Sequence, residues 1–207
     1  MHLNSIINYF FFLAISFQLV AQQDDSLNNE HELLGVKLGG VLPMGFGDNF
    51  ASEAIDFSYG AELQANFYIF ESAFFFGYRF QYLRGDVEEQ SLVGNYDYTN
   101  VTFNGLNLGY QYKFSNKWGI EPSLSYGRTR FRNYQTNSPN SLDFEDSANT
   151  LFVSLPLNYS LSKVFKIYLQ PEYRTDFMNI KTAASNASFF DRTQFFNLVI
   201  GVKLSLF

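Results

Sequence analysis

Apolar and polar residues alternate with a period of two along most of this 207-residue chain, and this alternation limits its fold more than any other feature. In segment 59–69, Tyr59, Leu63 and Phe67 share one face, while Glu62 and Gln64 share the other. The same division recurs in segments 34–38, 74–82, 106–114, 118–126, 151–159, 165–174 and 198–206. The pattern therefore predicts eight strands, each with one apolar and one polar face.

The connections between these segments alternate between short and long. Three are of hairpin length, at residues 71–72, 115–117 and 162–164. The other four are long and rich in Asn, Ser, Asp and Gly, at about residues 43–57, 84–99, 133–149 and 179–191. In each short hairpin the parity of opposed residues keeps the apolar face on one side of the sheet. This order predicts an up-and-down antiparallel meander.

Residue size indicates which face of the sheet is inside. The apolar faces carry large rings, and the polar faces carry Gly, Ser, Asn and Gln with scattered charges, which suits a narrow polar interior and a lipid-facing exterior. Aromatic residues also gather near strand ends, as at the two interfaces of a membrane barrel: Tyr82, Tyr110, Tyr112, Phe114, Trp118, Tyr126, Phe165 and Tyr173. We expect an all-β, eight-stranded, antiparallel up-and-down transmembrane β-barrel. The alternative is a soluble lipid-carrying barrel with the apolar face inside.

The N-terminal segment is typical of an export signal. Residues 8–20 form an apolar run that is too short for a membrane-spanning helix, and Ala21 is the expected cleavage point. We expect a signal peptide at 1–21, a short periplasmic lead at 22–31 and the barrel at 32–207, placed in the cell outer membrane. The chain has no cysteine, which excludes a disulfide scaffold, a lipoprotein anchor and a thiolate metal site. Its net charge of −6, without a basic run, argues against nucleic acid as a partner.

Two segments carry a resemblance to a known family. These are Val153-Ser-Leu-Pro-Leu-Asn-Tyr159 and Tyr168-Leu-Gln-Pro-Glu-Tyr173, in a chain that ends at Phe207. With the signal peptide and the eight alternating strands, they resemble the PorT-type, OmpA-like outer-membrane β-barrel family of Bacteroidota. The resemblance implies a location in the outer membrane and does not imply a particular activity.

The C-terminus resembles the signal that the barrel-assembly machinery reads, which favours a glycine, two spaced apolar residues and a terminal aromatic. The residues that carry it are Gly201, Leu204, Leu206 and Phe207. The sequence departs from this signal at Val199, where a polar residue is commoner, and in placing Phe207 on the face opposite Leu206. The resemblance implies the assembly machinery as a partner.

Charged residues of both signs fall on the inward face and predict a polar network that fills the interior. They are Lys37, Glu62, Arg79, Lys113, Glu121, Lys166, Glu172, Arg174 and Lys203. An eight-stranded barrel is only wide enough for its own side chains, and buried ions need partners. The predicted register places Glu62 opposite Gln81 and Gln64 opposite Arg79, so Glu62 and Arg79 are diagonal neighbours within reach of an ion pair. The alternative is a gated pore or a proton path.

Catalysis is not expected. Outer-membrane enzymes of this size rely on a histidine base, and this chain has only His2, in the signal peptide, and His31, at the start of the first strand. The long loops carry Asp48, Glu53, Asp56, Asp86, Glu88, Glu89, Asp143, Glu145 and Asp146. Such loops are a solvated surface or, as the alternative, bind divalent cations. We predict no cofactor and no resident metal.

Arg128, Arg130 and Arg132 continue the lipid-facing phase beyond the nine residues 118–126, which already span about one bilayer. Guanidinium groups match phosphate oxygens, so these arginines are candidates for contact with lipopolysaccharide in the outer leaflet. The alternative is a solvated strand extension whose arginines pair with the acidic loops.

Two functions are compatible with these features. The first is a structural or interaction component of the cell envelope that contacts outer-membrane lipid and another envelope protein, as in a secretion or assembly complex. The second is a small transporter or channel of the outer membrane, which requires a continuous path through the interior.

Overall fold

The computed structural model describes residues 32–69, 73–135, 144–178, 180 and 187–207. The expected signal peptide at 1–21, the expected lead at 22–31 and the predicted turn at 71–72 lie outside these residues.

The described residues form eleven strand pieces in one sheet and three short helices. The strands are β1 (Leu34–Gly45), β2 (Ile55–Tyr68), β3 (Phe74–Val87), β4 (Tyr98–Tyr110), β5 (Tyr112–Lys113), β6 (Trp118–Ile120), β7 (Ser123–Tyr134), β8 (Phe144–Ser154), β9 (Leu157–Ser160), β10 (Phe165–Met178) and β11 (Arg192–Leu206). The helices are α2 (Phe50–Glu53), α3 (Gln90–Val93) and α4 (Ala187–Phe190).

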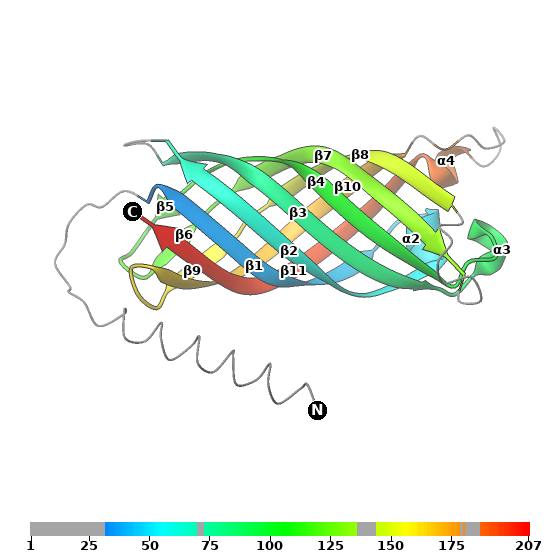
Figure 1. Ribbon diagram of the computed structural model, residues 1–207, viewed down its shortest axis with the longest axis horizontal. Coiled ribbons are helices and arrows are strands. Elements are labelled where there is room, and N and C mark those ends of the chain that lie inside the picture. Colours follow the sequence, from blue (N-terminus) through cyan, green and yellow to red (C-terminus); the bar gives the residue numbers. More distant parts are fainter. Residues whose placement is uncertain (1–31, 70–72, 136–143, 179, 181–186) are drawn as a thin grey trace, which may run out of the picture.

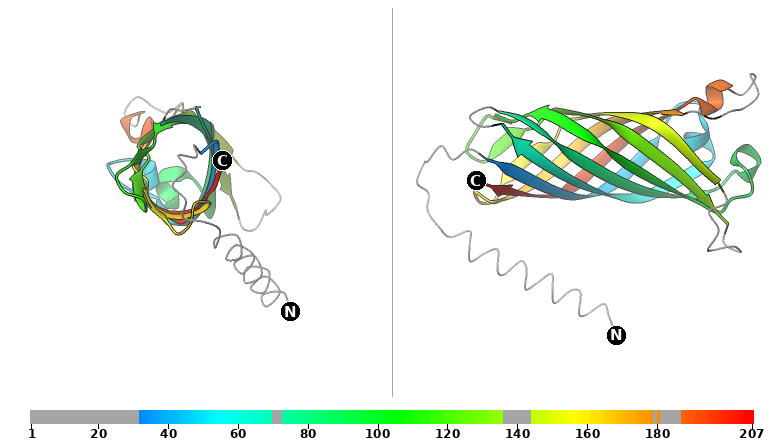
Figure 2. Two further views of the ribbon diagram at one scale, coloured as in Figure 1. Left: turned by 90° about the vertical axis from the view of Figure 1, so that its left-hand side faces the viewer. Right: turned by 45° about the horizontal axis from the view of Figure 1, so that its top comes forward.

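Eleven pieces make eight crossings because three crossings are each divided in two. β4 continues into β5 after Gln111, β6 continues into β7 around Pro122, and β8 continues into β9 around Pro156. Proline has no backbone N–H and so interrupts the hydrogen-bond ladder. All pairings are antiparallel, and β1 pairs with β11 from Leu34↔Leu206 to Gly45↔Phe195, which closes the sheet into the predicted eight-stranded barrel (Figures 1 and 2).

The barrel has two unlike ends. The hairpins β5–β6 and β9–β10 lie at the end where the chain terminates, which we call the short-turn end, and α2, α3 and α4 lie at the opposite, long-loop end (Figure 1). Among the described residues no helix is long and apolar enough to cross a bilayer.

The strands extend further toward the long-loop end than the sequence predicts. β4 begins at Tyr98, before the predicted segment 106–114, and β8 begins at Phe144, before the predicted segment 151–159. β7 ends at Tyr134, two residues beyond the predicted continuation through Arg132. Outward residues in these extensions are polar, so the apolar alternation stops while the backbone ladder continues. Parts of the predicted loops, at residues 84–87, 98–99, 133–134 and 144–149, are therefore strand.

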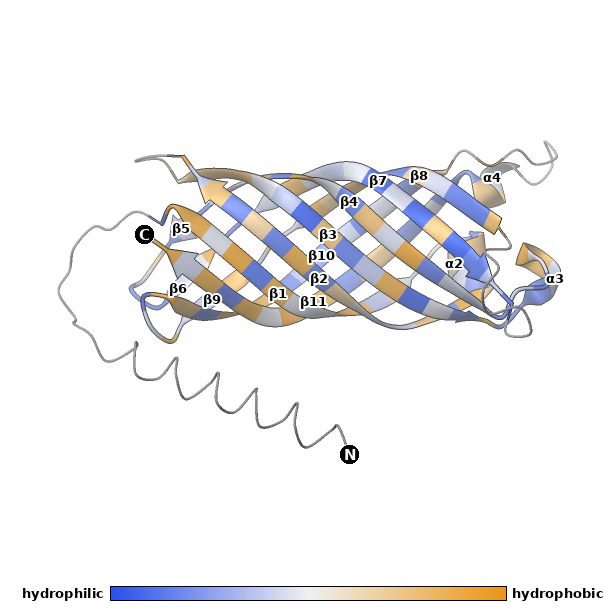
Figure 3. Cartoon of the chain, viewed as in Figure 1, coloured by the Kyte–Doolittle hydropathy of each residue, from blue (hydrophilic) through white to orange (hydrophobic). Residues whose placement is uncertain are grey.

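Outward and inward faces follow the predicted alternation, which Figure 3 shows along the strands. Large apolar side chains are exposed on the outside, with Leu106 at 70% and Leu108 at 62%, whereas charged residues such as Glu62 and Arg79 are buried inside. One β-bulge, between Phe57 and Tyr59 in β2, shifts the phase by one residue. As a result Phe57 points inward, although the odd-numbered residues from Tyr59 onward point outward.

The apolar core sits inside the long-loop end. There the Asn49 side chain caps α2 by accepting hydrogen bonds from the backbone N–H groups of Ala51 and Ser52. The capped helix packs Phe50, 7% exposed, against Phe131 and Phe190 at ring-centroid distances of 5.9 and 5.6 Å. Below it lie Phe57, Leu83, Val101 and Phe195 from four strands.

Candidate functional site

A buried ionic network occupies the middle of the barrel, and Arg79 is its centre. The Arg79 guanidinium pairs with the carboxylates of both Glu62 and Glu172, and none of the three side chains is exposed. The register is the predicted one, with Glu62 opposite Gln81 and Gln64 opposite Arg79. One cation thus lies between two anions.

Amide groups complete the hydrogen bonding of these two carboxylates. Gln81 and Gln170 each donate to both of them, at distances from 2.8 to 3.2 Å. Gln64 donates to Glu62 at 2.6 Å, and Asn197 donates to Glu172 at 2.8 Å. Buried charges are tolerated when they are paired and their remaining lone pairs are satisfied, which is the case here.

A second ion pair lies one step nearer the long-loop end. Arg174 Nε contacts Asp176 at 3.0 Å, and Arg174 also donates to Gln81 and to Thr129. Thr150 and Thr193 donate to Asp176 at 2.6 and 2.9 Å. The network is therefore continuous with that of Arg79 through Gln81.

A third cluster lies near the short-turn end and holds three lysines and two glutamates. Lys37 and Lys203 contact Glu121, while Lys203 and Lys166 contact Glu32 at 2.6 and 2.9 Å. Glu32 precedes β1. Burial alone would raise the pKa of its carboxyl, but the ammonium groups of Lys203 and Lys166 outweigh burial and lower that pKa.

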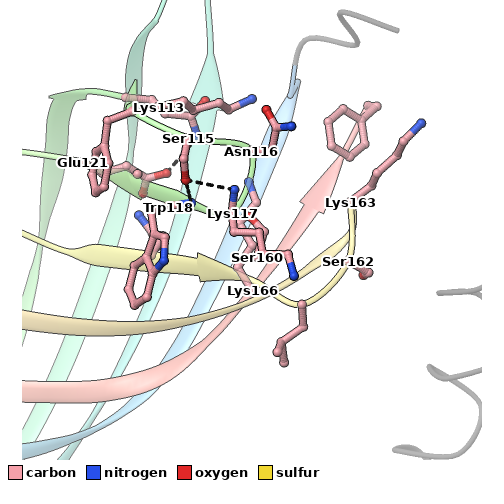
Figure 4. A pocket seen from close by; sticks show the side chains of 16 residues that line it. Lys113, Ser115, Asn116, Lys117, Trp118, Glu121, Ser160, Ser162, Lys163 and Lys166 are labelled. Carbon is pink, nitrogen blue, oxygen red and sulfur yellow. Dashed lines mark hydrogen bonds between the residues drawn. The ribbon is translucent and has the colours of Figure 1, made fainter. Parts of the chain in front are cut away.

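Lys113 is not part of this buried network, contrary to the sequence prediction. Its side chain is exposed, because β5 lies at the rim of the barrel beside the turn at 115–117. It lines a cavity of about 650 Å³ between the Glu121 cluster and the two short turns, which we call the vestibule. Figure 4 shows Lys113, Lys117, Lys163 and Lys166 around the vestibule.

The outward arginines lie where the exterior changes from apolar to polar. Arg128 stands between Asn104 of β4 and Asn149 of β8 in the ladder, and the next outward residues toward the short-turn end are Leu106, Tyr126 and Leu151. The change occurs at one level on three neighbouring strands, so it marks the edge of the apolar band. Arg128, Arg130 and Arg132 begin at that edge.

Two of these arginines have an acidic neighbour. Glu145 of β8 contacts Arg132 at 2.9 Å and Arg130 at 3.7 Å. The hydrogen bond to Glu145 raises the pKa of the Arg132 guanidinium, so this side chain stays cationic. Arg130 remains 55% exposed and Arg128 is exposed, which leaves both accessible from outside.

The predicted assembly signal lies on β11 and just after it. Leu204 and Leu206 point outward with Val36 and Leu34 as their ladder partners, and Phe207 lines the vestibule. Gly201 faces Gly39 on β1, and a side chain at Gly201 would meet the backbone oxygen of Leu38 and the ring of Tyr168. Because β1, β11 and Tyr168 approach one another closely here, there is no room for a side chain at Gly201.

Comparison with protein families places this barrel. The model of the outer membrane protein beta-barrel domain matches residues 91–206, more than half of the chain. The chain belongs to this family. As a member of the outer membrane protein beta-barrel domain family it lies in the outer membrane, with its short-turn end toward the periplasm and its long-loop end outside.

Solved structures with the same fold are small outer-membrane barrels. Ail of Yersinia pestis, in complex with the heparin analogue sucrose octasulfate, is 13% identical with a TM-score of 0.54, covering 86% of this chain and 100% of Ail. Neisserial surface protein A is 12% identical, with a TM-score of 0.53 over 84% of this chain and 97% of that one. OprG of Pseudomonas aeruginosa is 14% identical, with a TM-score of 0.52 over 85% and 97%. No curated protein matches the chain.

Sequence reasoning did not identify several residues that lie in the interior of this barrel. Asp176 lies two residues after Arg174 and on the same inward face of β10. The alternation of inward and outward residues could therefore have predicted that Asp176 is in the interior. Glu32 lies only two residues before β1 and was not assigned an inward position. The inward turn of Phe50 and Phe57 depends on a helix cap and a bulge, which the alternation does not reveal.

The acidic loops do not assemble a metal centre in the described part of the chain. No group of three or more His, Cys, Asp or Glu side chains there could hold a metal ion. His31 and Asp143 lie outside the described residues.

Proposed function

We propose that this protein is an outer-membrane barrel with a filled polar interior that serves as a structural or interaction component of the cell envelope, in a secretion or assembly complex. The observation that carries the proposal is the Glu62–Arg79–Glu172 network, whose members have no exposed surface. Side chains joined by ion pairs and hydrogen bonds across the barrel leave little room for a solute.

The apolar cluster at the long-loop end supports the same proposal. α2 and Phe50 lie inside the mouth, and Phe195 and Phe131 pack beneath them without exposure to solvent. A hydrated ion entering from outside would have to displace both the apolar cluster and the ionic network below it.

The proposal includes a finer assignment within the family. The two segments around Pro156 and Pro171 favour a PorT-type member of Bacteroidota, exported by residues 1–21 and inserted by the barrel-assembly machinery through Gly201, Leu204, Leu206 and Phe207. It assigns no catalytic activity, cofactor or metal to the protein.

Lipopolysaccharide is the proposed lipid partner. Arg128 and Arg130 are exposed on the outward face at the edge of the apolar band, where the outer leaflet presents its phosphates. Glu145 partly neutralises the charge of Arg130 and Arg132, so Arg128 contributes most to the contact with lipopolysaccharide.

A small transporter or channel is the second candidate function. The vestibule favours it, because a cavity of about 650 Å³ enters the barrel from the periplasmic side as far as Glu121. Passage of a solute would require both the Arg79 network and the helix α2 to move out of its path.

Two measurements test the proposal. In planar lipid bilayers the purified protein should show no resolved conductance steps, whereas stable ion-selective channel events would favour the second candidate. In cells, crosslinking with mass spectrometry should recover a specific envelope protein. Recovery of lipid alone, together with conductance, would contradict an interaction role.

A further inference from the structure

Positive charge is concentrated at the short-turn end of the barrel. The chain has seven lysines, and six of them lie there: Lys37, Lys113, Lys117, Lys163, Lys166 and Lys203. The seventh, Lys181, lies outside the described residues. The protein as a whole carries a net charge of −6, so this end of the barrel is positively charged although the whole chain is negatively charged.

Nearby carboxylates do not neutralise this charge. Lys37, Lys166 and Lys203 share the two carboxylates of Glu32 and Glu121. In the described ranges, neither Lys113 nor Lys117 has a carboxylate within ion-pair distance. The vestibule thus faces the periplasm with a surplus of ammonium groups.

Two residues that line the vestibule, Gln111 and Lys166, already bind one glutamate of the segment before β1. Glu32 lies outside the strands, yet it is only 4% exposed. Lys166, Lys203 and Gln111 contact its carboxylate at 2.6 to 3.1 Å. This arrangement shows how lysines of this barrel end bind a carboxylate that a peptide backbone presents.

An unsatisfied acceptor lies in the same cavity. Asn158 of β9 lines the vestibule and is 5% exposed, and its Oδ1 atom has no hydrogen-bond partner within the described structure. A buried acceptor of this kind favours a ligand that brings an N–H donor. A peptide brings backbone N–H donors and, when it contains Asp or Glu, carboxylates as well.

We propose that the vestibule binds an acidic segment of a partner polypeptide from the periplasmic side. Lys113 and Lys117 bind its carboxylates, and Asn158 accepts a hydrogen bond from its backbone. The cavity of about 650 Å³ is within the usual size of ligand pockets. This inference rests on the proposed interaction role and names the site and the chemistry of the partner.

The test measures binding of a synthetic peptide to the full-length mature protein in a neutral detergent. The probe is a short fluorescein-labelled peptide of alternating Glu and Ser, and its control replaces every Glu by Gln. We expect fluorescence anisotropy to show binding of the acidic peptide only, and to show weaker binding as ionic strength rises. The peptide should also protect Lys113 and Lys117 from acetylation, as read by mass spectrometry.

Variants locate the site. Lys113→Gln with Lys117→Gln should weaken binding about five- to tenfold. Both side chains lie at the exposed rim, so the barrel fold is retained. The matched control, Arg84→Gln with Arg192→Gln, removes the same charge at the other end of the barrel and should leave the affinity unchanged.

Four results would overturn the inference: equal binding of the Gln peptide, full affinity in the double lysine variant, preferential binding of soluble peptidoglycan fragments, or binding seen only when Asp24, Asp25 and Glu30 are changed to Asn, Asn and Gln. The last result would assign the vestibule to the chain's own acidic lead. Failure here is distinct from failure of the proposed function, because crosslinking could still recover a partner at another surface.

Discussion

At the scale of single residues, the stability of the interior depends on the small number of cations that neutralise its buried carboxylates. Arg79 is the one basic side chain that contacts Glu62 or Glu172 within the described structure, and its guanidinium lies 3.9 Å from the centre of the Phe152 ring. Loss of this group leaves two carboxylates with uncharged hydrogen-bond partners only. A buried charge without a counter-ion destabilises a fold far more than an intact ion pair stabilises it.

Arg79→Ala is therefore expected to lower the free energy of unfolding by about 3 to 5 kcal/mol. Urea titration in lipid vesicles, followed by the fluorescence of Trp118, the only tryptophan, measures this change. Adding Glu62→Gln and Glu172→Gln to the same variant removes the unpaired charges and should restore a large part of the loss. An unchanged midpoint in Arg79→Ala would contradict the central role of this residue.

Asp146 gives a prediction with a pH dependence. It lies in the part of β8 beyond the apolar band, opposite Phe131, and burial raises the pKa of its carboxyl. A raised pKa in the folded state means that the ionised form is disfavoured there. Stability from this group is therefore complete below its unfolded pKa of about 4 and is lost as the pH rises through its folded pKa.

Asp146→Asn should then stabilise the barrel near neutral pH, by no more than about 0.5 kcal/mol because the side chain is only half-buried. The gain should vanish at about pH 3, where the wild-type carboxyl is protonated. Thermal midpoints in neutral detergent at the two pH values measure this difference. Asp48→Asn, at an exposed position of the same barrel end, is the control and should change neither midpoint.

At the scale of elements, the sequence predicts the strands well inside the apolar band and poorly outside it. β2 and β3 pair in the predicted register, because opposed Phe67 and Phe76 must both face lipid. Beyond the band no such demand exists, so the outward residues Asn100, Thr102 and Asn104 are polar and lie outside the predicted segment 106–114, although they are strand. The ladder continues there because each strand has a hydrogen-bonded neighbour on both sides.

The α2 element illustrates what alternation cannot show. Its four residues, Phe50–Glu53, are too few for a helical period, and only the Asn49 cap and the burial of Phe50 identify it. A predicted loop thus becomes part of the core through contacts with Phe131 and Phe190, which are distant in sequence. Tertiary packing determines this element.

Phe50→Ala should remove these contacts and lower the free energy of unfolding by about 3 kcal/mol. It should also make residues 46–54 more susceptible to protease added outside the cell. Leu92→Ala in α3 is a suitable control, because Leu92 is exposed at the same end of the barrel. Equal protease sensitivity in wild type and Phe50→Ala would show that α2 does not depend on Phe50 for its place in the mouth.

At the scale of the whole molecule, charge is sorted along the barrel axis. Lysines gather at the periplasmic end, while Arg84, Arg128, Arg130, Arg132 and Arg192 lie toward the outside. The outer end also carries acidic residues: Asp48, Glu53, Asp56, Asp86, Glu88, Glu89, Asp97, Glu145, Asp146 and Asp191. The alternation of the strands predicts from the sequence most of the charged residues that lie inside the barrel. The distribution of charge along the barrel axis becomes visible only after each turn is assigned to one end of the barrel. Arginines on the outer face suit phosphate, whereas lysines around a periplasmic cavity suit carboxylates on a flexible segment.

The outer arginines lead to a prediction that separates lipid binding from fold stability. Changing Arg128, Arg130 and Arg132 to Gln should reduce lipopolysaccharide co-purification and lower the thermal midpoint in lipopolysaccharide-containing membranes. In detergent the midpoint should stay within about 1 kcal/mol of wild type, because only the exposed pairs with Glu145 are lost. Arg192→Gln, exposed on β11, removes a charge away from this face and should leave co-purification unchanged. Equal losses in membranes and in detergent would instead assign the three arginines to ion pairing within the strand extension, since a contact with phosphate stabilises the barrel only where phosphate is present.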